Sequence, residues 1–156
     1  MRTGARFSRC RRFRYALWRT WDPAGPMVMM IGLNPSTADA ERDDPTIRRC
    51  IGFARDWGFG GVWVANLFAF RATRPADLRA APDPVGPRND MWLRRISGRS
   101  GRIVAAWGNH GRFMGRSDRV GAMFGRRLEV IRLNAGGEPA HPLYLPKKLK
   151  PLPWKN

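Results

Sequence analysis

Four short apolar segments alternate along the chain with segments of helical character, and this alternation constrains the fold more than any other feature. The apolar segments are short, and residues 61–70 are rich in β-branched and aromatic residues, which favours buried strands over helices. Strands that alternate with helices build a parallel, doubly wound sheet with helices on both faces. We therefore expect an α/β fold, a three-layer α/β/α arrangement with a mostly parallel central sheet. The expected strands span residues 27–33, 61–70, 102–107 and 128–133, with an edge strand at 12–21, and the expected helices span 46–57, 87–96 and 110–124.

The size and apolar content of the chain are those of one domain. It has 156 residues, 43% of them hydrophobic, and neither a linker nor an internal repeat divides it, so we expect a single domain over residues 1–156. The longest apolar run, residues 27–33, is far shorter than the roughly 20 residues of a membrane-spanning helix. We expect no membrane segment, no secretory signal and a monomeric protein of the cytoplasm. Two cysteines, Cys10 and Cys50, cannot form a disulfide framework or a four-thiolate cluster, and we expect neither a metal nor a cofactor.

Basic residues outnumber acidic ones by a wide margin, 29 Lys and Arg against 12 Asp and Glu, for a formal net charge of +17. Such a surface attracts a polyanion, because neutralising phosphates releases counterions. GC-rich codon usage would also enrich Arg, but it would enrich Asp and Glu codons as well and so does not explain the imbalance. We expect DNA, double- or single-stranded, as the partner. The charge is concentrated in a basic N-terminal segment, residues 1–20, with seven arginines and no acid, and in a basic tail, residues 146–156.

Three polar features follow or end the expected strands, where open α/β sheets bind ligands. The first is Gly32-Leu33-Asn34-Pro35-Ser36, in which glycine permits close approach and Asn34 offers both a donor and an acceptor. Asn34 and Ser36 have a simpler interpretation as caps of the next segment. The second is Asn66, an amide in an apolar strand that either bonds to backbone or reads a nucleobase edge. The third is His141, which follows a Gly- and Pro-rich loop and precedes three lysines.

In this order and spacing, the three features resemble the motifs of the uracil-DNA glycosylase superfamily. Gly32-Leu33-Asn34-Pro35 is similar to the first catalytic motif, in the GINP form of the mismatch-specific and thymine glycosylase branch. Residues 62–70 resemble the strand whose Asn reads the flipped uracil, and His141-Pro142 resembles the second catalytic motif. The resemblance runs over residues 27–150. It implies a uracil-DNA glycosylase-like fold and a DNA N-glycosylase, a hydrolase that flips and releases a damaged or modified base.

The resemblance also implies a role for each site residue. Asn34 would position a water, His141 would donate a hydrogen bond to the base oxygen, and Asn66 would recognise the base edge. The pocket would be lined by Gly32, Pro35, Ser36 and Asn66, with Phe68 or Phe70 stacking on the ring, and Leu145 falls where that family carries its duplex-wedging Leu. The expected nucleic-acid contacts are Arg11, Arg12, Arg71, Arg74, Leu145, Lys147 and Lys148.

Longer segments are similar to a bacterial and phage family known as domain of unknown function 1643. The similar segments are GLNPSTADA, DDPTIRRC, WGFGG, NLFAFRAT, DPVGPRND, AAWGNHG and HPLYL. They cover most of the chain. This family has no established activity, so the likeness points to a family and not to a reaction.

The sequence departs from the glycosylase pattern at positions that matter for chemistry. Asn34 stands where the most active enzymes have Asp, and an amide cannot act as a base. Leu143 stands where Ser is usual. We expect Asp43 to supply the missing carboxylate as a catalytic residue and Asp44 to cap the following helix. Two other functions stay open: a non-catalytic nucleic-acid-binding module on the same fold, and a nucleotide- or base-modification enzyme of phage or bacterial origin.

Overall fold

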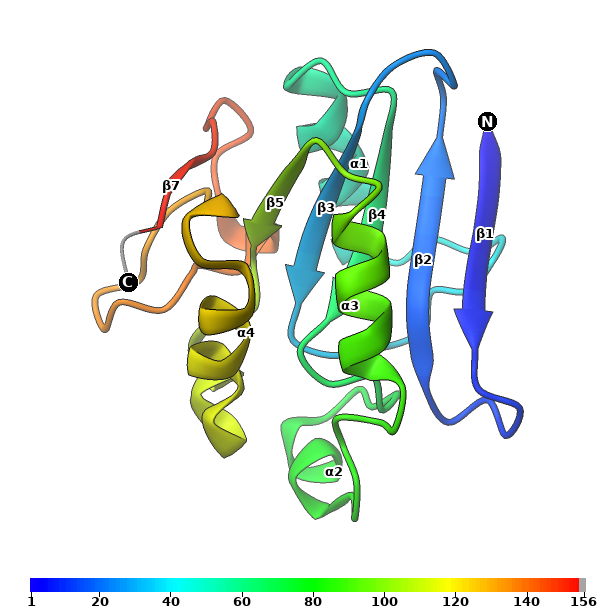
Figure 1. The fold of residues 1–156 in the computed structure, drawn as a ribbon, viewed down its shortest axis with the longest axis vertical. Coiled ribbons are helices and arrows are strands. Elements are labelled where there is room, and N and C mark those ends of the chain that lie inside the picture. Colours follow the sequence, from blue (N-terminus) through cyan, green and yellow to red (C-terminus); the bar gives the residue numbers. More distant parts are fainter. Residues whose placement is uncertain (155–156) are drawn as a thin grey trace.

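The computed structural model describes residues 1–154, which form an α/β fold around one seven-stranded mixed sheet (Figure 1). The strands are β1 (Arg2–Phe7), β2 (Arg14–Thr20), β3 (Met27–Gly32), β4 (Gly61–Asn66), β5 (Arg102–Ala105), β6 (Leu128–Val130) and β7 (Leu152–Pro153). The α-helices are α1 (Pro45–Asp56), α2 (Pro75–Ala80), α3 (Asn89–Ser97) and α4 (Arg116–Phe124), and the 3₁₀ turns are η1 (Asn109–Gly115), η2 (Gly125–Arg127) and η3 (Pro142–Tyr144). The last two residues of the expected basic tail, 155 and 156, lie outside this range.

The sheet has the order β1-β2-β4-β3-β5-β6-β7, with a parallel centre and antiparallel edges. β3 pairs in parallel with both β4 and β5, and β5 pairs in parallel with β6. β1, β2 and β7 join in antiparallel orientation, so the expectation of a mostly parallel sheet is corrected to a mixed one. The reason is local. A two-stranded hairpin at the N-terminus extends the sheet on the β4 side, and the C-terminal segment folds back on β6.

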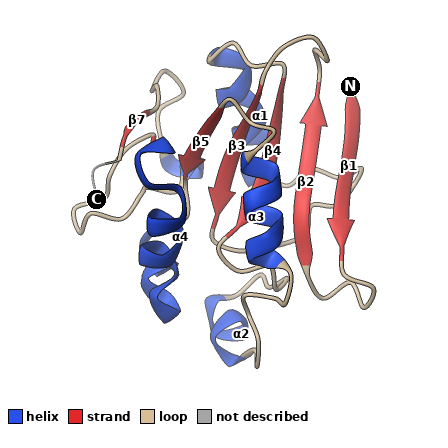
Figure 2. Cartoon of the chain, in the orientation of Figure 1, coloured by secondary structure: helices blue, strands red, loops and turns tan. Residues whose placement is uncertain are grey.

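Helices cover both faces of the sheet, which explains why the central strands are apolar on both sides (Figure 2). Val28 and Met30 of β3 face a buried cluster that contains α1. Met29 and Ile31 face the opposite cluster, which contains residues of α3 and α4. Successive residues of a strand point to opposite faces, so the short apolar run of β3 belongs to two cores at once.

The expected central strands and the helices expected over 46–57 and 87–96 are confirmed within a few residues. The helix expected over 110–124 is corrected, because η1 occupies its first turn and α4 begins only at Arg116, after the non-helical Phe113 and Met114. Two peripheral elements differ as well. The strand expected to reach residue 70 ends at Asn66, because the next residues bond to the loop after β3 and to residues 84–85. The expected basic segment 1–20 is largely the β1–β2 hairpin, with a tight turn between the strands. β1 carries exposed arginines and one buried position, Gly4, so its sequence lacks the apolar alternation of a strand.

Among residues 1–154, no helix combines the length and the apolar character that crossing a bilayer requires. Within the same residues, no three His, Cys, Asp or Glu side chains are grouped to hold a metal ion.

Candidate functional site

A cavity of about 190 Å³ lies at the carboxyl ends of the central strands and gathers side chains from distant parts of the sequence. Asn34 follows β3, Asn66 ends β4, and His141 comes from the loop after β6, yet all three line this cavity. The four parallel strands lie side by side in the order β4, β3, β5, β6. When they are numbered by their order along the chain, this order is 2-1-3-4, so the connections turn in opposite directions on either side of β3. Ligands of open α/β sheets bind beyond the carboxyl ends at such a reversal. The cavity therefore stands where this topology favours a binding site.

Asn34 is held by the backbone, which fixes the direction of its amide. Its Nδ2 donates to the carbonyl oxygens of Pro35 at 3.1 Å and Ala72 at 2.7 Å. Both donor hydrogens are thereby engaged, and no hydrogen bond from residues 1–154 reaches the Oδ1 atom. The amide therefore offers an acceptor to whatever occupies the cavity.

Asn66 is 4% exposed, and its side-chain amide differs from that of Asn34, because its oxygen and not its nitrogen is bonded within the protein. Its Oδ1 accepts from the Nη2 of Arg14 at 3.4 Å, while its backbone oxygen accepts from the Nδ2 of Asn89 at 2.8 Å. With Oδ1 taken, Nδ2 is the group left to meet a ligand. Gly32 makes room for it, because a Cβ at that position would stand 3.0 Å from this Nδ2.

His141 is half-buried, and its contacts define which nitrogen carries the proton. The Nδ1 accepts from the backbone N–H of Leu143 at 3.2 Å, so the neutral ring carries its proton on Nε2. Burial lowers the pKa of His141 below its usual value, and the nearby Asp44 carboxylate offsets part of that effect. At neutral pH the imidazole is therefore an uncharged donor at the cavity wall.

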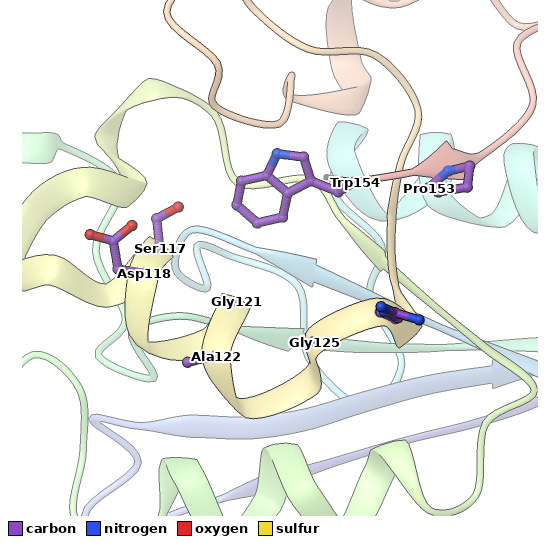
Figure 3. A pocket seen from close by; sticks show the side chains of 8 residues that line it. Ser117, Asp118, Gly121, Ala122, Gly125, Pro153 and Trp154 are labelled. Atoms are coloured by element: carbon purple, nitrogen blue, oxygen red, sulfur yellow. The ribbon is translucent and has the colours of Figure 1, made fainter. Parts of the chain in front are cut away.

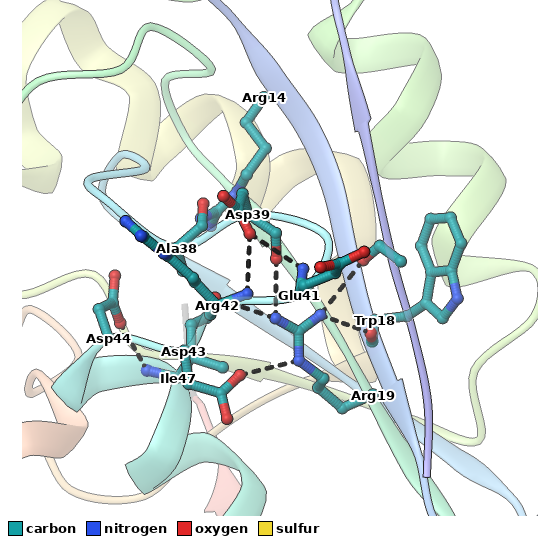
Figure 4. Close-up of polar contacts among 11 residues, drawn as sticks. Arg14, Trp18, Arg19, Ala38, Asp39, Glu41, Arg42, Asp43, Asp44 and Ile47 are labelled. Atoms are coloured by element: carbon teal, nitrogen blue, oxygen red, sulfur yellow. Dashed lines mark hydrogen bonds and ion pairs between the residues drawn. The ribbon is translucent and has the colours of Figure 1, made fainter.

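The carboxylate of the cavity is Asp44, which corrects the expectation for Asp43 (Figure 4). Asp43 points away and pairs with the Nε of Arg19 at 2.8 Å. Asp44 caps α1 as expected, since its Oδ1 accepts from the N–H of Ile47 at 2.9 Å, and it also lines the cavity. The helix begins where expected, with Asp44 as its cap, and the ion pair with the buried Arg19 holds Asp43 outside the cavity, so the cap and the cavity carboxylate are the same residue.

Two buried arginines, Arg14 and Arg19, organise the loop between β3 and α1, and the sequence analysis singled out neither. Arg19 is 1% exposed and donates to Asp43 and to four backbone oxygens, two of them in the loop, at Asp39 and Arg42 (Figure 4). Arg14 is 2% exposed, donates from Nη1 to the oxygen of Ala38 at 3.1 Å and lines the cavity. The available signal was their position in the apolar strand β2, where a charged side chain needs a partner.

A family model for proteins of unknown function, DUF1643, matches residues 14–143. The chain belongs to the DUF1643 family. The matched region begins at Arg14 and includes every residue that lines the cavity. Comparisons with curated proteins and with solved structures gave no match.

In this DUF1643 protein, the expected stacking and wedging residues lie elsewhere. Phe68 is fully buried against Phe113, with ring centroids 5.5 Å apart, and Phe70 packs edge-on against Phe13. Neither lines the cavity. The expected duplex wedge is wrong, because Leu145 is 6% exposed and belongs to the core beside α1. Its neighbour Tyr144 is 84% exposed.

Two open grooves carry part of the expected basic surface of the DUF1643 protein. One shares Ser36, Ala72 and Thr73 with the cavity and includes Phe70 and Arg71. The other lies beside α1, and its basic residues are Arg48, Arg49 and Lys147. The remaining expected contacts, Arg11, Arg12, Arg74 and Lys148, are exposed and line neither groove.

A larger hollow of about 870 Å³ lies between α4 and the C-terminal strand (Figure 3). Its lining includes Ser117, Asp118 and Trp154, with several glycine and alanine positions. It contains none of the polar groups that converge at the carboxyl edge. The smaller cavity is therefore the candidate site.

Proposed function

We propose that this protein is a DNA base N-glycosylase that holds an extruded nucleobase in the cavity and hydrolyses its bond to the sugar. The observation that carries the proposal is the convergence of Asn34, Asn66 and His141 on one cavity, each presenting a different polar group. An acceptor, an amide donor and a neutral imidazole donor are the groups that this reaction needs.

The size of the cavity suits a single ring. Apolar cavities of about 150 Å³ bind benzene, and this cavity measures about 190 Å³. A six-membered base fits such a space, whereas a whole nucleotide would have to leave its sugar and phosphate outside. Base flipping produces this arrangement, because the base enters the pocket while its sugar and phosphates stay in the DNA backbone.

The chemistry is a displacement at C1′ of the sugar. The Oδ1 of Asn34 accepts from a water and aims it, and the Asp44 carboxylate takes the proton of that water as its oxygen bonds to C1′. The electron pair of the C1′–N bond leaves with the base. His141 donates from Nε2 to the base oxygen on which negative charge grows, and the base then takes a proton from solvent.

We also propose that this α/β fold is glycosylase-like. Helices on both faces of the sheet agree with the three-layer arrangement expected from the resemblance. The groove that shares lining residues with the cavity carries Arg71, and the groove along α1 carries Lys147, and both offer positive charge to the phosphates that flank an extruded base.

The test is incubation of the full chain with oligonucleotides that carry a panel of modified bases, followed by alkaline strand cleavage and mass detection of free base. His141→Gln removes the charge-stabilising donor and should lower the rate by about 10²–10³. Asp44→Asn should lower it as well. His110→Gln is the matched control, because His110 is exposed and does not line the cavity, and its rate should equal that of the wild type.

A second function, binding of an extruded base without hydrolysis, is favoured by Asn34 itself. Its amide cannot accept a proton, and both of its donor hydrogens are engaged with backbone. Wild-type protein that binds DNA with an unpaired base, yet releases no base from the panel, would replace the glycosylase with this binding module.

A further inference from the structure

Three arginines of residues 1–154 are buried, and one of them lacks an anionic partner. Arg19 pairs with Asp43 at 2.8 Å, and Arg116 pairs with Asp90 at 2.7 Å. Arg14 forms no ion pair with any carboxylate of the described residues. Its two contacts are the carbonyl of Ala38 and a long bond to the amide of Asn66.

The guanidinium of Arg14, which lines the cavity, keeps unused bonding capacity, because Nη1 and Nη2 each carry two hydrogens and make one hydrogen bond each. Its Nε is buried and has no hydrogen-bond partner within residues 1–154. An unpartnered buried donor is costly, and an unpaired buried charge is more so, unless something completes the site. Burial lowers the pKa of Arg14 to about 10, and the Asp44 carboxylate, which lines the same cavity without pairing with Arg14, offsets part of that effect, so the side chain still carries its charge at neutral pH.

Asn66, beside Arg14 in the cavity lining, also presents a donor. Asn66 presents Nδ2 because its oxygen faces Arg14, and Gly32 leaves space in front of that amide. The carboxylate in the lining, Asp44, has one oxygen committed to the N-terminus of α1. The thiol of Cys50 stays protonated, because burial raises its pKa to about 12.

We propose that Arg14 is the anion-selecting group of the cavity, and that the ligand is a single planar ring with negative charge on its inner edge. The inference rests on the proposed function only for the identity of that ring, a nucleobase that gains negative charge as it departs. In that setting Arg14 acts at the edge next to Asn66, while His141 acts from another wall.

Direct binding tests the charge preference without any catalysis. Benzoate and benzamide have nearly the same shape and differ in charge, so they are titrated by calorimetry into the full-length protein at neutral pH and constant ionic strength. Wild-type protein should bind benzoate at least about tenfold more tightly, equivalent to about 1.4 kcal/mol. Equal binding of the two rings, or binding of neither at millimolar concentration, would overturn the proposal.

Variants separate selection of charge from structural support. Arg14→Gln should bring the benzoate-to-benzamide ratio near one, and Arg14→Lys should retain a preference for benzoate. Arg12→Gln removes the same charge from an exposed position two residues away and should leave the ratio unchanged. If Arg14→Gln fails to fold, the wild-type ratio and the Arg14→Lys ratio still decide the question. A ratio that survives Arg14→Gln would overturn the assignment to this residue.

The two proposals fail in different ways. Benzoate selectivity without release of any base leaves the anion site standing and removes the glycosylase. Base release by a wild-type protein that does not distinguish benzoate from benzamide removes the anion site and leaves the glycosylase.

Discussion

Replacing Arg19 with Met should destabilise the protein strongly, although its ion-pair partner lies near the surface. Arg19 is 1% exposed and joins β2 to the loop that carries Asp44, through Asp43 and the oxygens of Asp39 and Arg42. Hydrogen bonds from charged donors contribute about 1.5–3 kcal/mol each, but the loop carbonyls can regain water once the side chain is gone. Breaking a buried pair by removing one partner costs about 3–5 kcal/mol, and we expect a loss in that range. A typical domain has only about 5–15 kcal/mol in total.

The partner substitution should behave differently, and this asymmetry is the test. The side chain of Asp43 is 31% exposed, so Asp43→Asn keeps an acceptor and can hydrate, and it should cost about 1 kcal/mol or less. Arg2→Met, at an exposed position of β1, is the control for loss of charge. Urea unfolding followed by tryptophan fluorescence measures all three variants. If Arg19→Met costs no more than Asp43→Asn, the loop is not held through Arg19 and the reasoning is wrong.

Further predictions concern the cavity wall, the imidazole and the basic grooves. Gly32→Ala should weaken ring binding, measured by calorimetry, and destabilise the fold modestly, because the new Cβ would stand 3.0 Å from the Nδ2 of Asn66. Gly52→Ala lies inside α1, and its Cβ would meet nothing within 4 Å. This control should stabilise the protein by about 0.5–1 kcal/mol in urea unfolding. His141 should titrate below its usual pKa by NMR in the His110→Gln variant. The unfolded chain then takes up the proton first, so unfolding free energy should fall as the pH drops below about 6.5. DNA affinity should fall steeply with salt, and Arg71→Glu beside the cavity should weaken it more than Arg99→Glu in the turn before β5, as measured by fluorescence anisotropy.

The position of the site was predictable because it follows from strand direction. Once the apolar runs are taken as parallel strands, their carboxyl ends must meet at one edge, and Asn34 and Asn66 must approach each other there. His141 could be added because it follows the last strand of the same group. No side-chain geometry is needed for this step, only the order of strands and loops.

The choice between neighbouring residues was not predictable, because it depends on packing. Asp43 and Asp44 differ by one position at a helix start, and only the direction of the chain entering α1 decides which one meets the cavity. Leu145 is followed by lysines and was expected to be exposed, yet η3 lays it against α1, where the Arg49 side chain bonds its carbonyl. A hydrophobic residue in a basic loop carries no sign of which side of the loop faces the core.

The basic residues of this chain serve two purposes, a charged surface and a set of buried contacts, and composition alone cannot tell which arginine serves which. Arg14, Arg19 and Arg116 are buried within the described residues and serve the interior, two through ion pairs and one at the cavity wall. Codon bias explains a high arginine content, but it does not explain why one buried guanidinium is left without a carboxylate beside an asparagine that turns toward it. An unpaired buried charge is disfavoured in a protein that uses it only for structure, because a neutral side chain would support the same loop at lower cost. The Asp44 carboxylate lines the same cavity and raises the pKa of Arg14, but it forms no ion pair with Arg14, and the anionic ring proposed above would supply a direct counter-charge. For this reason the charge selectivity of the cavity is a sharper test of function than the net charge of the chain.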